Sequence, residues 1–187
     1  TPMVRACEKG DFDSVKAMVE GHDVEKTGIS VDEMVSKEGK NSRGKSQTPL
    51  LASILQGHTA ITTYLVKEFK VDGSGGPLVI ASEKGDLNSV KAMVEGHDVE
   101  KTGMSVGKML NREGKNSSGE SARPIDVAAT GLKFDIVVYL AGKGAKGEKF
   151  AGTPMVRACE KGDLDSVKAL VEGHDVEKTG ISVDEMV

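Results

Sequence analysis

The chain has 187 residues, of which 37% are hydrophobic, 29% are charged and only 3% are aromatic. Its net charge of −4 excludes the global basic field with which proteins hold nucleic acid or an anionic membrane. No apolar run is long enough to form a transmembrane helix, and the first residues lack the pattern of a secretory signal. We therefore expect an intracellular, cytoplasmic protein without a membrane span.

The strongest feature of the sequence is internal repetition. Residues 1–35 recur as residues 153–187 with two changes, Phe12 to Leu164 and Met18 to Leu170, which gives a period of 152 residues. A close echo begins at Gly76, and weaker echoes begin at Thr48 and Arg123. Long and short units alternate over about 1–47, 48–75, 76–122, 123–152 and the incomplete 153–187. We expect one repeat array over 1–187, taken from a longer array.

The first unit predicts a helix–turn–helix. Pro2 suits the first turn of a helix, because its missing N–H costs nothing there, and Gly10 ends that helix. Apolar residues at helical spacing from Phe12 to Val19 predict a second helix, which Gly21 closes. The other units repeat this pattern.

The long units carry extra residues after Val24 and Val99. Ser30 and Glu33 form a capping-box pattern that predicts a short third helix over about 31–38, ended by Gly39. Ile29 and Met34 occupy the positions of a hydrophobic staple around this cap. The second copy keeps Ser105 and the pair Met104 and Met109, but places Lys108 where the capping Glu stands. Residues 36–47 and 111–122 that follow are predicted to be polar, mobile loops.

The segment TPLLASILQGHTAITTYLV at 48–66 resembles an ankyrin repeat, and Gly21-His22-Asp23-Val24 resembles its Gly-Ala-Asp-Val turn. The His that follows Thr-Pro-Leu in that family is absent, since Val4, Leu51, Val79, Asp126 and Val156 stand there. The resemblance implies an all-α solenoid of stacked helix–turn–helix repeats, here with an extra short helix in alternate connectors. It also implies a concave surface and loops that bind protein partners.

One loop matches a phosphate-binding pattern. Gly39-Lys40-Asn41-Ser42-Arg43-Gly44-Lys45-Ser46 fits G-x-x-x-x-G-K-S in full. That pattern works between a strand and a helix of a parallel sheet, whereas a capped helix precedes it here. In the second copy Glu120 stands where the lysine should be. We interpret the match as a solvated loop and keep nucleotide hydrolysis as a minor hypothesis.

The histidines and cysteines predict no metal site and no disulfide. His22, His97 and His174 occupy equivalent positions in different layers, so they cannot converge on one ion. Cys7 and Cys159 are likewise several layers apart, beyond disulfide reach. The histidines are interpreted as connector packing and the cysteines as small buried hydrophobes.

The loops of the long units hold the candidate partner-binding residues. These are basic side chains that could meet an acidic partner or a phosphate group, namely Lys37, Lys40, Arg43, Lys45, Arg112 and Lys115. The competing interpretation is an ordinary solvated surface.

Together these features predict a non-catalytic protein–protein interaction scaffold, with no cofactor, no metal, no nucleic-acid partner and a protein partner of unknown identity. The alternative is a structural spacer or filament-forming segment of a longer array, with end-to-end self-association or continuation of the repeats.

Overall fold

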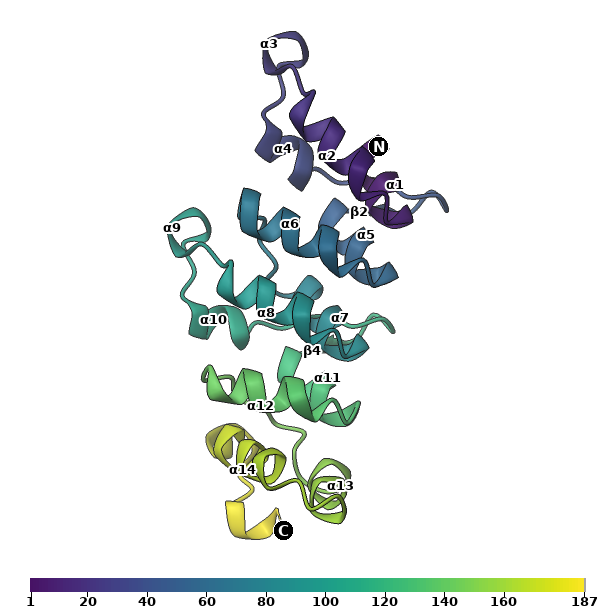
Figure 1. The fold of residues 1–187 in the computed structure, drawn as a ribbon. Helices are drawn as coiled ribbons and strands as arrows, with labels where there is room; N and C mark the ends of the chain where they lie inside the picture. The colour runs from purple at the N-terminus through teal and green to yellow at the C-terminus, as the bar shows by residue number, and fades with distance from the viewer. Residues whose placement is uncertain (187) are drawn as a thin grey trace. The chain divides into compact units, whose positions relative to one another are not determined.

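A computed structural model describes residues 1–186, with only the backbone of Lys178. The chain divides into two compact units, and the division passes through the helix Leu87–Glu95. The first unit contains Thr1–Gly73 and Lys91–Thr102, and the second contains Ser74–Val90 and the described part of Gly103–Val187. Figure 1 labels many of the elements described below.

The first unit is built from helix pairs with short connector elements. Its helices are α1 (Pro2–Lys9), α2 (Phe12–Glu20), α3 (Val24–Thr27), α4 (Val31–Ser36), α5 (Pro49–Gln56), α6 (Thr59–Phe69), the second half of α8 (Leu87–Glu95) and α9 (Val99–Thr102). A two-stranded antiparallel hairpin joins β1 (Gly39–Lys40) to β2 (Ser46–Gln47), with Gly39 opposite Gln47 and Lys40 opposite Ser46.

The second unit repeats this plan. Its helices are α7 (Gly76–Lys84), the first half of α8, α10 (Val106–Leu110), α11 (Pro124–Thr130), α12 (Phe134–Gly142), α13 (Thr153–Glu160), α14 (Leu164–Gly173), α15 (Val176–Thr179) and the 3-10 turn η1 (Val183–Glu185). A second hairpin pairs β3 (Gly114–Lys115) with β4 (Ser121–Ala122). The predicted class of stacked helix–turn–helix repeats is confirmed, and the two hairpins are an addition that the sequence did not predict.

Local chemistry explains where the paired helices begin and end. Asp11 caps α2 by accepting the backbone N–H of Ser14 at 2.9 Å, and Thr48 caps α5 by accepting that of Leu51 at 3.1 Å. Gly10 ends α1 in a left-handed conformation with φ 76°, which a side chain would strain.

Neighbouring repeats in the first unit share a thin apolar core. Helix α1 packs on α5, and α2 on α6, so that Val4, Cys7 and Val15 are fully buried. His58 adds a polar link between these repeats, because its Nε2 lies 3.1 Å from the carbonyl oxygen of Glu8. Burial at about 25 cal/mol per Å² of apolar surface is the main force that holds such layers together.

In the second unit a charged clamp joins the short repeat to the repeat that follows. α11 packs on α7 and α12 packs on α14. Arg123, only 12% exposed in its side chain, forms ion pairs with Glu148 at 3.1 Å and Asp175 at 3.2 Å. Asp126, which stands at the position of the family histidine, accepts the backbone N–H groups of Glu148 and Lys149. Burial raises the pKa of the Asp126 carboxyl.

The connector of the long unit is more ordered than its sequence suggested. Ser30 caps α4 by accepting the N–H of Glu33 at 3.1 Å, as predicted, but the Glu33 carboxylate pairs with Lys37 at 3.3 Å instead of returning to Ser30. The return bond forms in the third copy, where Glu185 accepts the N–H of Ser182 at 2.8 Å. Residues 39–47, predicted as a mobile loop, form the first hairpin instead.

The connector histidines hold a turn in place. His22 Nε2 donates to the carbonyl of Ile29 at 2.7 Å and His174 Nε2 to that of Ile181 at 3.1 Å, which closes the loop around α3 and α15. The sequence did not predict these one-turn helices, although Asp23 caps α3 by accepting the N–H of Lys26 at 3.0 Å. The interpretation of the histidines as connector packing is confirmed.

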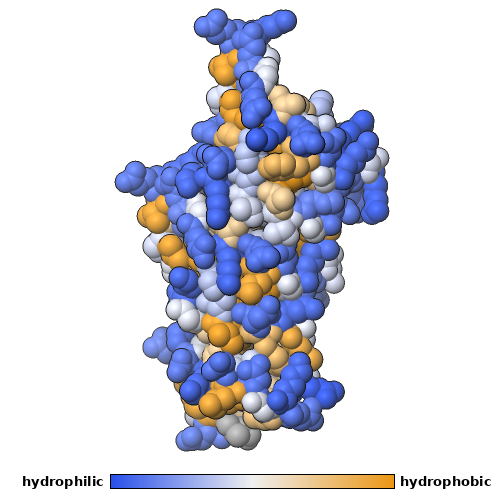
Figure 2. All heavy atoms as spheres, in the orientation of Figure 1, coloured by the Kyte–Doolittle hydropathy of each residue, from blue (hydrophilic) through white to orange (hydrophobic). Residues whose placement is uncertain are grey.

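Charged and polar side chains dominate the visible surface in Figure 2, with small apolar patches between them. The larger exposed apolar side chains are those of Val24, Val99, Val156, Leu164, Val176 and Ile181. No helix among residues 1–186 is both long and apolar enough to cross a bilayer.

The two cysteines should differ in reactivity although their sequence surroundings are the same. Cys7 is buried and desolvation raises its pKa to about 12, whereas Cys159 is exposed, contrary to its interpretation as a buried hydrophobe. We expect a thiol-specific reagent near pH 8 to label one thiol quickly and the second only after denaturation. Mass spectrometry of the labelled peptides checks this. Rapid labelling of Cys7 in a folded Cys159→Ser variant would contradict the packing of α1 on α5.

Candidate interaction surface at the first hairpin

The first hairpin is built around the side chain of Asn41, which is 8% exposed. Its Oδ1 accepts the backbone N–H groups of Arg43 and Lys45, each at 2.9 Å. The N–H of Gly44 is bound by the Asn41 carbonyl at 3.1 Å, and Gly44 takes φ 78°. The second hairpin repeats these bonds around Asn116. The turn is therefore set by a local network common to both copies.

A carboxylate on α1 fastens the hairpin to the helix. Glu8 accepts the backbone N–H of Ser42 at 2.8 Å and its hydroxyl at 2.7 Å, and these bonds lower the pKa of Glu8. Glu83 on α7 makes the same pair of bonds to Ser117, at 3.0 and 2.6 Å. Both oxygens of each carboxylate are thus directed at a hairpin.

Three cationic side chains surround the junction between α1 and the hairpin. Arg5, Lys9 and Arg43, together with Glu8 and Ser42, line a hollow of about 450 Å³, which Gln56 of α5 completes. Arg5 and Lys9 are exposed and lie one helical turn apart on the same side of α1. None of the three cations forms an ion pair within the described residues. The hollow can hold an acidic group against several donors.

Over the described residues, the other two copies differ from the first in the side chains that line this hollow or in their contacts. In the second copy Ile80 and Ser118 stand at the positions of Arg5 and Arg43. In the third copy, for which the printed sequence holds no hairpin residues, Arg157 pairs with Glu160 at 2.7 Å. In the first copy the Glu8 carboxylate is hydrogen-bonded to Ser42 and does not pair with Arg5, which is the residue equivalent to Arg157. The N–H donors of Arg5 are therefore available to another acceptor.

The structure separates the six predicted basic residues into different roles. Arg43 lines the hollow, whereas Lys37 is engaged with Glu33 and Arg112 donates to the Ser74 hydroxyl at 2.8 Å. The exposed side chains of Lys40, Lys45 and Lys115 lie on the hairpins away from any described ion pair. Arg5 and Lys9 were not predicted from the sequence, although their spacing of four on a short amphipathic helix was a usable signal.

The phosphate-loop match does not have the geometry of a phosphate cradle. In such a cradle, successive backbone N–H groups point at the anion. Here the N–H of Ser42 is bound by Glu8, and those of Arg43, Gly44 and Lys45 are bound by Asn41. The flanking strands are antiparallel and two residues long. Across residues 1–186, no three His, Cys, Asp or Glu side chains gather where they could hold a metal ion.

Comparison with known proteins places this geometry in a family. A sequence model described as ankyrin repeats (3 copies) matches residues 3–103, a little over half of the chain. A search of curated proteins finds no significant match.

One solved structure shows the same fold at low sequence identity, and a second is reported beside it. An ankyrin repeat protein from Leishmania major is 19% identical with a TM-score of 0.52, and the match covers 95% of this chain and 59% of that one. The ankyrin repeat domain of human ASB11 is 16% identical with a TM-score of 0.49, covering 100% of this chain and 91% of that one. The chain thus spans 59% of the length of the Leishmania protein.

The bonds between Glu8 and Ser42 should make the docking of the first hairpin depend on pH. Because the folded state lowers the pKa of Glu8, their stabilisation is present above the carboxyl's ordinary pKa and is lost as the pH falls through the lowered value. In Ser42→Ala we expect an NMR titration to show the Glu8 pKa moving up toward its ordinary value. An unchanged Glu8 titration would contradict the observed bonds.

Proposed function

Because the chain belongs to the ankyrin-repeat family, we propose that it is a non-catalytic scaffold that binds an acidic segment of a protein partner at the first hairpin. Ankyrin repeats are generally protein–protein interaction modules, and stacked repeats offer an extended surface for this purpose. The observation that carries the proposal is the cationic hollow between α1 and the hairpin, lined by Arg5, Lys9 and Arg43.

The chemistry of the hollow supports an acidic partner. The guanidinium groups of Arg5 and Arg43 offer planar, forked donors that match a carboxylate or phosphate better than a lysine does. Lys40 and Lys45 on the same hairpin add positive charge around it, in a chain whose net charge is −4. A local cationic patch on an acidic protein favours specific encounter, because the rest of the surface repels the same ligand.

The hairpin gives this site a fixed backbone. Asn41 holds the turn by hydrogen bonds inside the hairpin, and Glu8 holds it by hydrogen bonds from α1. Arg43 therefore extends from an ordered element rather than from a free loop. Preorganisation of this kind reduces the entropy lost on binding. Lys115 and Arg112 of the second hairpin remain weaker candidates, since Ser118 and Glu120 accompany them there and Arg112 already bonds to Ser74.

Reversal of the two arginines should abolish this binding. In Arg5→Glu/Arg43→Glu we expect the affinity for a fluorescently labelled Glu-rich peptide to fall by about tenfold or more, because two cationic donors become repulsive. Fluorescence anisotropy at low and at physiological ionic strength measures this. The wild-type affinity should weaken as salt is added.

The matched control is Lys26→Glu, which reverses one exposed charge on α3, away from the hairpin, and is compared with Arg43→Glu alone. Lys26→Glu should bind the peptide almost as the wild type does, whereas Arg43→Glu should bind it more weakly. Equal loss in these two single variants would mean that the peptide responds only to net charge, and the proposed site would then be wrong. Circular dichroism establishes that all variants keep their helical content.

A further inference from the structure

The cationic hollow at the first hairpin carries an excess of two positive charges. Arg5, Lys9 and Arg43 contribute three positive charges, Glu8 contributes one negative charge, and the other residues that line the hollow are neutral. A single carboxylate of a partner would balance only one of the two excess charges. A phosphate monoester carries a charge of about −1.5 to −2 at pH 7 and would balance most or all of them.

The negative charge inside the hollow already has its own partner. Both oxygens of the Glu8 carboxylate accept hydrogen bonds from Ser42, at 2.7 and 2.8 Å. These bonds contribute most to the lowered pKa of Glu8, and the charges of Arg43 and Arg5 lower it further. Both guanidinium groups therefore lie near the same carboxylate, although neither forms an ion pair with it in the described part of the chain.

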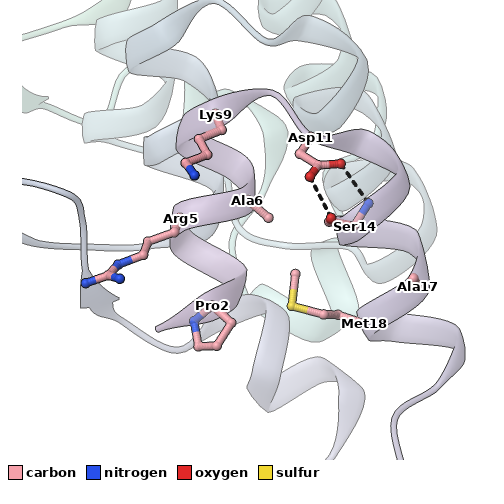
Figure 3. Close-up of a pocket in the computed structure, with 8 residues that line it drawn as sticks. All are labelled: Pro2, Arg5, Ala6, Lys9, Asp11, Ser14, Ala17 and Met18. Carbon is pink, nitrogen blue, oxygen red and sulfur yellow. Dashed lines mark hydrogen bonds between the residues drawn. The ribbon is translucent and has the colours of Figure 1, made fainter.

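The two cations of α1 stay accessible when a repeat precedes the helix pair. Figure 3 shows the side chains of Arg5 and Lys9 extending from the same side of α1, away from Met18 of α2. In the third copy the preceding repeat packs through α12 on α14. The side chain of Arg157, equivalent to Arg5, is nevertheless 56% exposed, and Lys161 at the position of Lys9 is exposed as well. The hollow is thus formed by α1, the hairpin and α5, and not by the face that α1 and α2 turn toward a preceding repeat.

The donors of the hollow match the geometry of a phosphate group. The guanidinium groups of Arg5 and Arg43 each carry a planar fork of N–H donors that can bind two phosphate oxygens at once. Lys9 adds a compact point charge. A phosphate monoester offers three strong acceptor oxygens and can accept from all three side chains, whereas a carboxylate offers only two oxygens.

The second copy lacks this excess of charge. Ile80 and Ser118 stand where the first copy has its two arginines, and Lys84, the remaining cation at these positions, is balanced by Glu83. The Glu83 carboxylate is bonded to its hairpin in the same way as that of Glu8. Two residues therefore distinguish a hairpin with the excess charge from a hairpin without it, on the same framework.

We infer that the cationic hollow binds a phosphorylated serine of a protein partner, with its phosphate between Arg5 and Arg43 and with Lys9 as the third donor. This inference rests on the proposed function, because it names the acidic group that the same hollow selects. It adds that a dianionic phosphate is preferred to a carboxylate. The phosphate belongs to the partner and is bound without any covalent change in this chain.

Three fluorescently labelled peptides test this inference on the whole chain. They share one short Gly/Ala sequence and carry serine, phosphoserine or glutamate at the same central position. By fluorescence anisotropy we expect the phosphoserine peptide to bind at least about tenfold more tightly than the glutamate peptide, and the serine peptide not to bind. Equal affinity for phosphoserine and glutamate would overturn the inference.

The Glu-rich peptide, measured on the same samples, keeps the inference and the proposed function apart. If the Glu-rich peptide binds and the phosphoserine peptide shows no preference over glutamate, only the inference fails. If neither of them binds, both fail.

The second ionisation of the phosphate gives a further readout. Because its pKa is about 6, we expect the affinity for the phosphoserine peptide to rise severalfold between about pH 5 and pH 7. Glu8 stays ionised in this range because its pKa is lowered, and Arg5, Lys9 and Arg43 stay positive. His58, whose Nε2 lies 3.1 Å from the Glu8 carbonyl, is a neighbour of a type that titrates here, and the glutamate peptide controls for it. A pH-independent affinity for phosphoserine, or an equal change for both peptides, would contradict binding of the dianion.

Variants of the chain locate the site. In Arg5→Ile/Arg43→Ser, which reproduces the second copy, we expect the affinity for the phosphoserine peptide to fall about tenfold or more. Arg5→Ile alone should bind more weakly than the wild type, and Arg157→Ile, the same substitution in the third copy, should leave binding unchanged. Circular dichroism establishes that the variants fold. Binding that survives in the double variant, or an equal loss in Arg5→Ile and Arg157→Ile, would overturn the assigned site.

Discussion

The apolar face that each helix pair turns toward its neighbour is the constraint on which the rest of this structure depends. Val4 in α1 is fully buried by the short repeat beside it, whereas Val156, at the same position of the third copy, is 54% exposed. A helix of eight residues is too short to be stable in water through its own hydrogen bonds. The burial of a side chain therefore depends more on the repeat that packs against it than on the type of residue.

The hairpins show how a repeat can keep its framework and change its surface. The residues that build each hairpin and attach it to its helix are the same in both long units, namely the asparagine that accepts the turn's N–H groups, the positive-φ glycine, and the paired glutamate and serine. The residues that differ point outward, as Arg43 and Ser118 do. A conserved internal network thus allows each hairpin to acquire its own charge without losing its fold.

The sequence predicted those features that depend on neighbours in the chain. Helix ends at Gly10 and Ser30 were predictable because capping bonds span only a few residues. The hairpin was missed because two of its fastening bonds join Ser42 to Glu8, 34 residues away. Likewise, neither the bond from Arg112 to Ser74 nor the exposure of Cys159 follows from local pattern. The cationic hollow was predicted in part, because only Arg43 of its three cations lies in the predicted loop, whereas Arg5 and Lys9 lie on α1.

The near-identity of residues 1–35 and 153–187 has a consequence for how such a protein can change length. A genetic exchange between these two segments adds or removes whole periods of 152 residues and leaves no altered join, because the sequence on either side of the crossover is the same. Each added period would carry one hairpin with Arg43 beside a helix with Arg5, and one hairpin with Ser118 beside a helix with Ile80. Growth of the gene by this route multiplies the two kinds of hairpin in fixed order, without any need for new packing solutions.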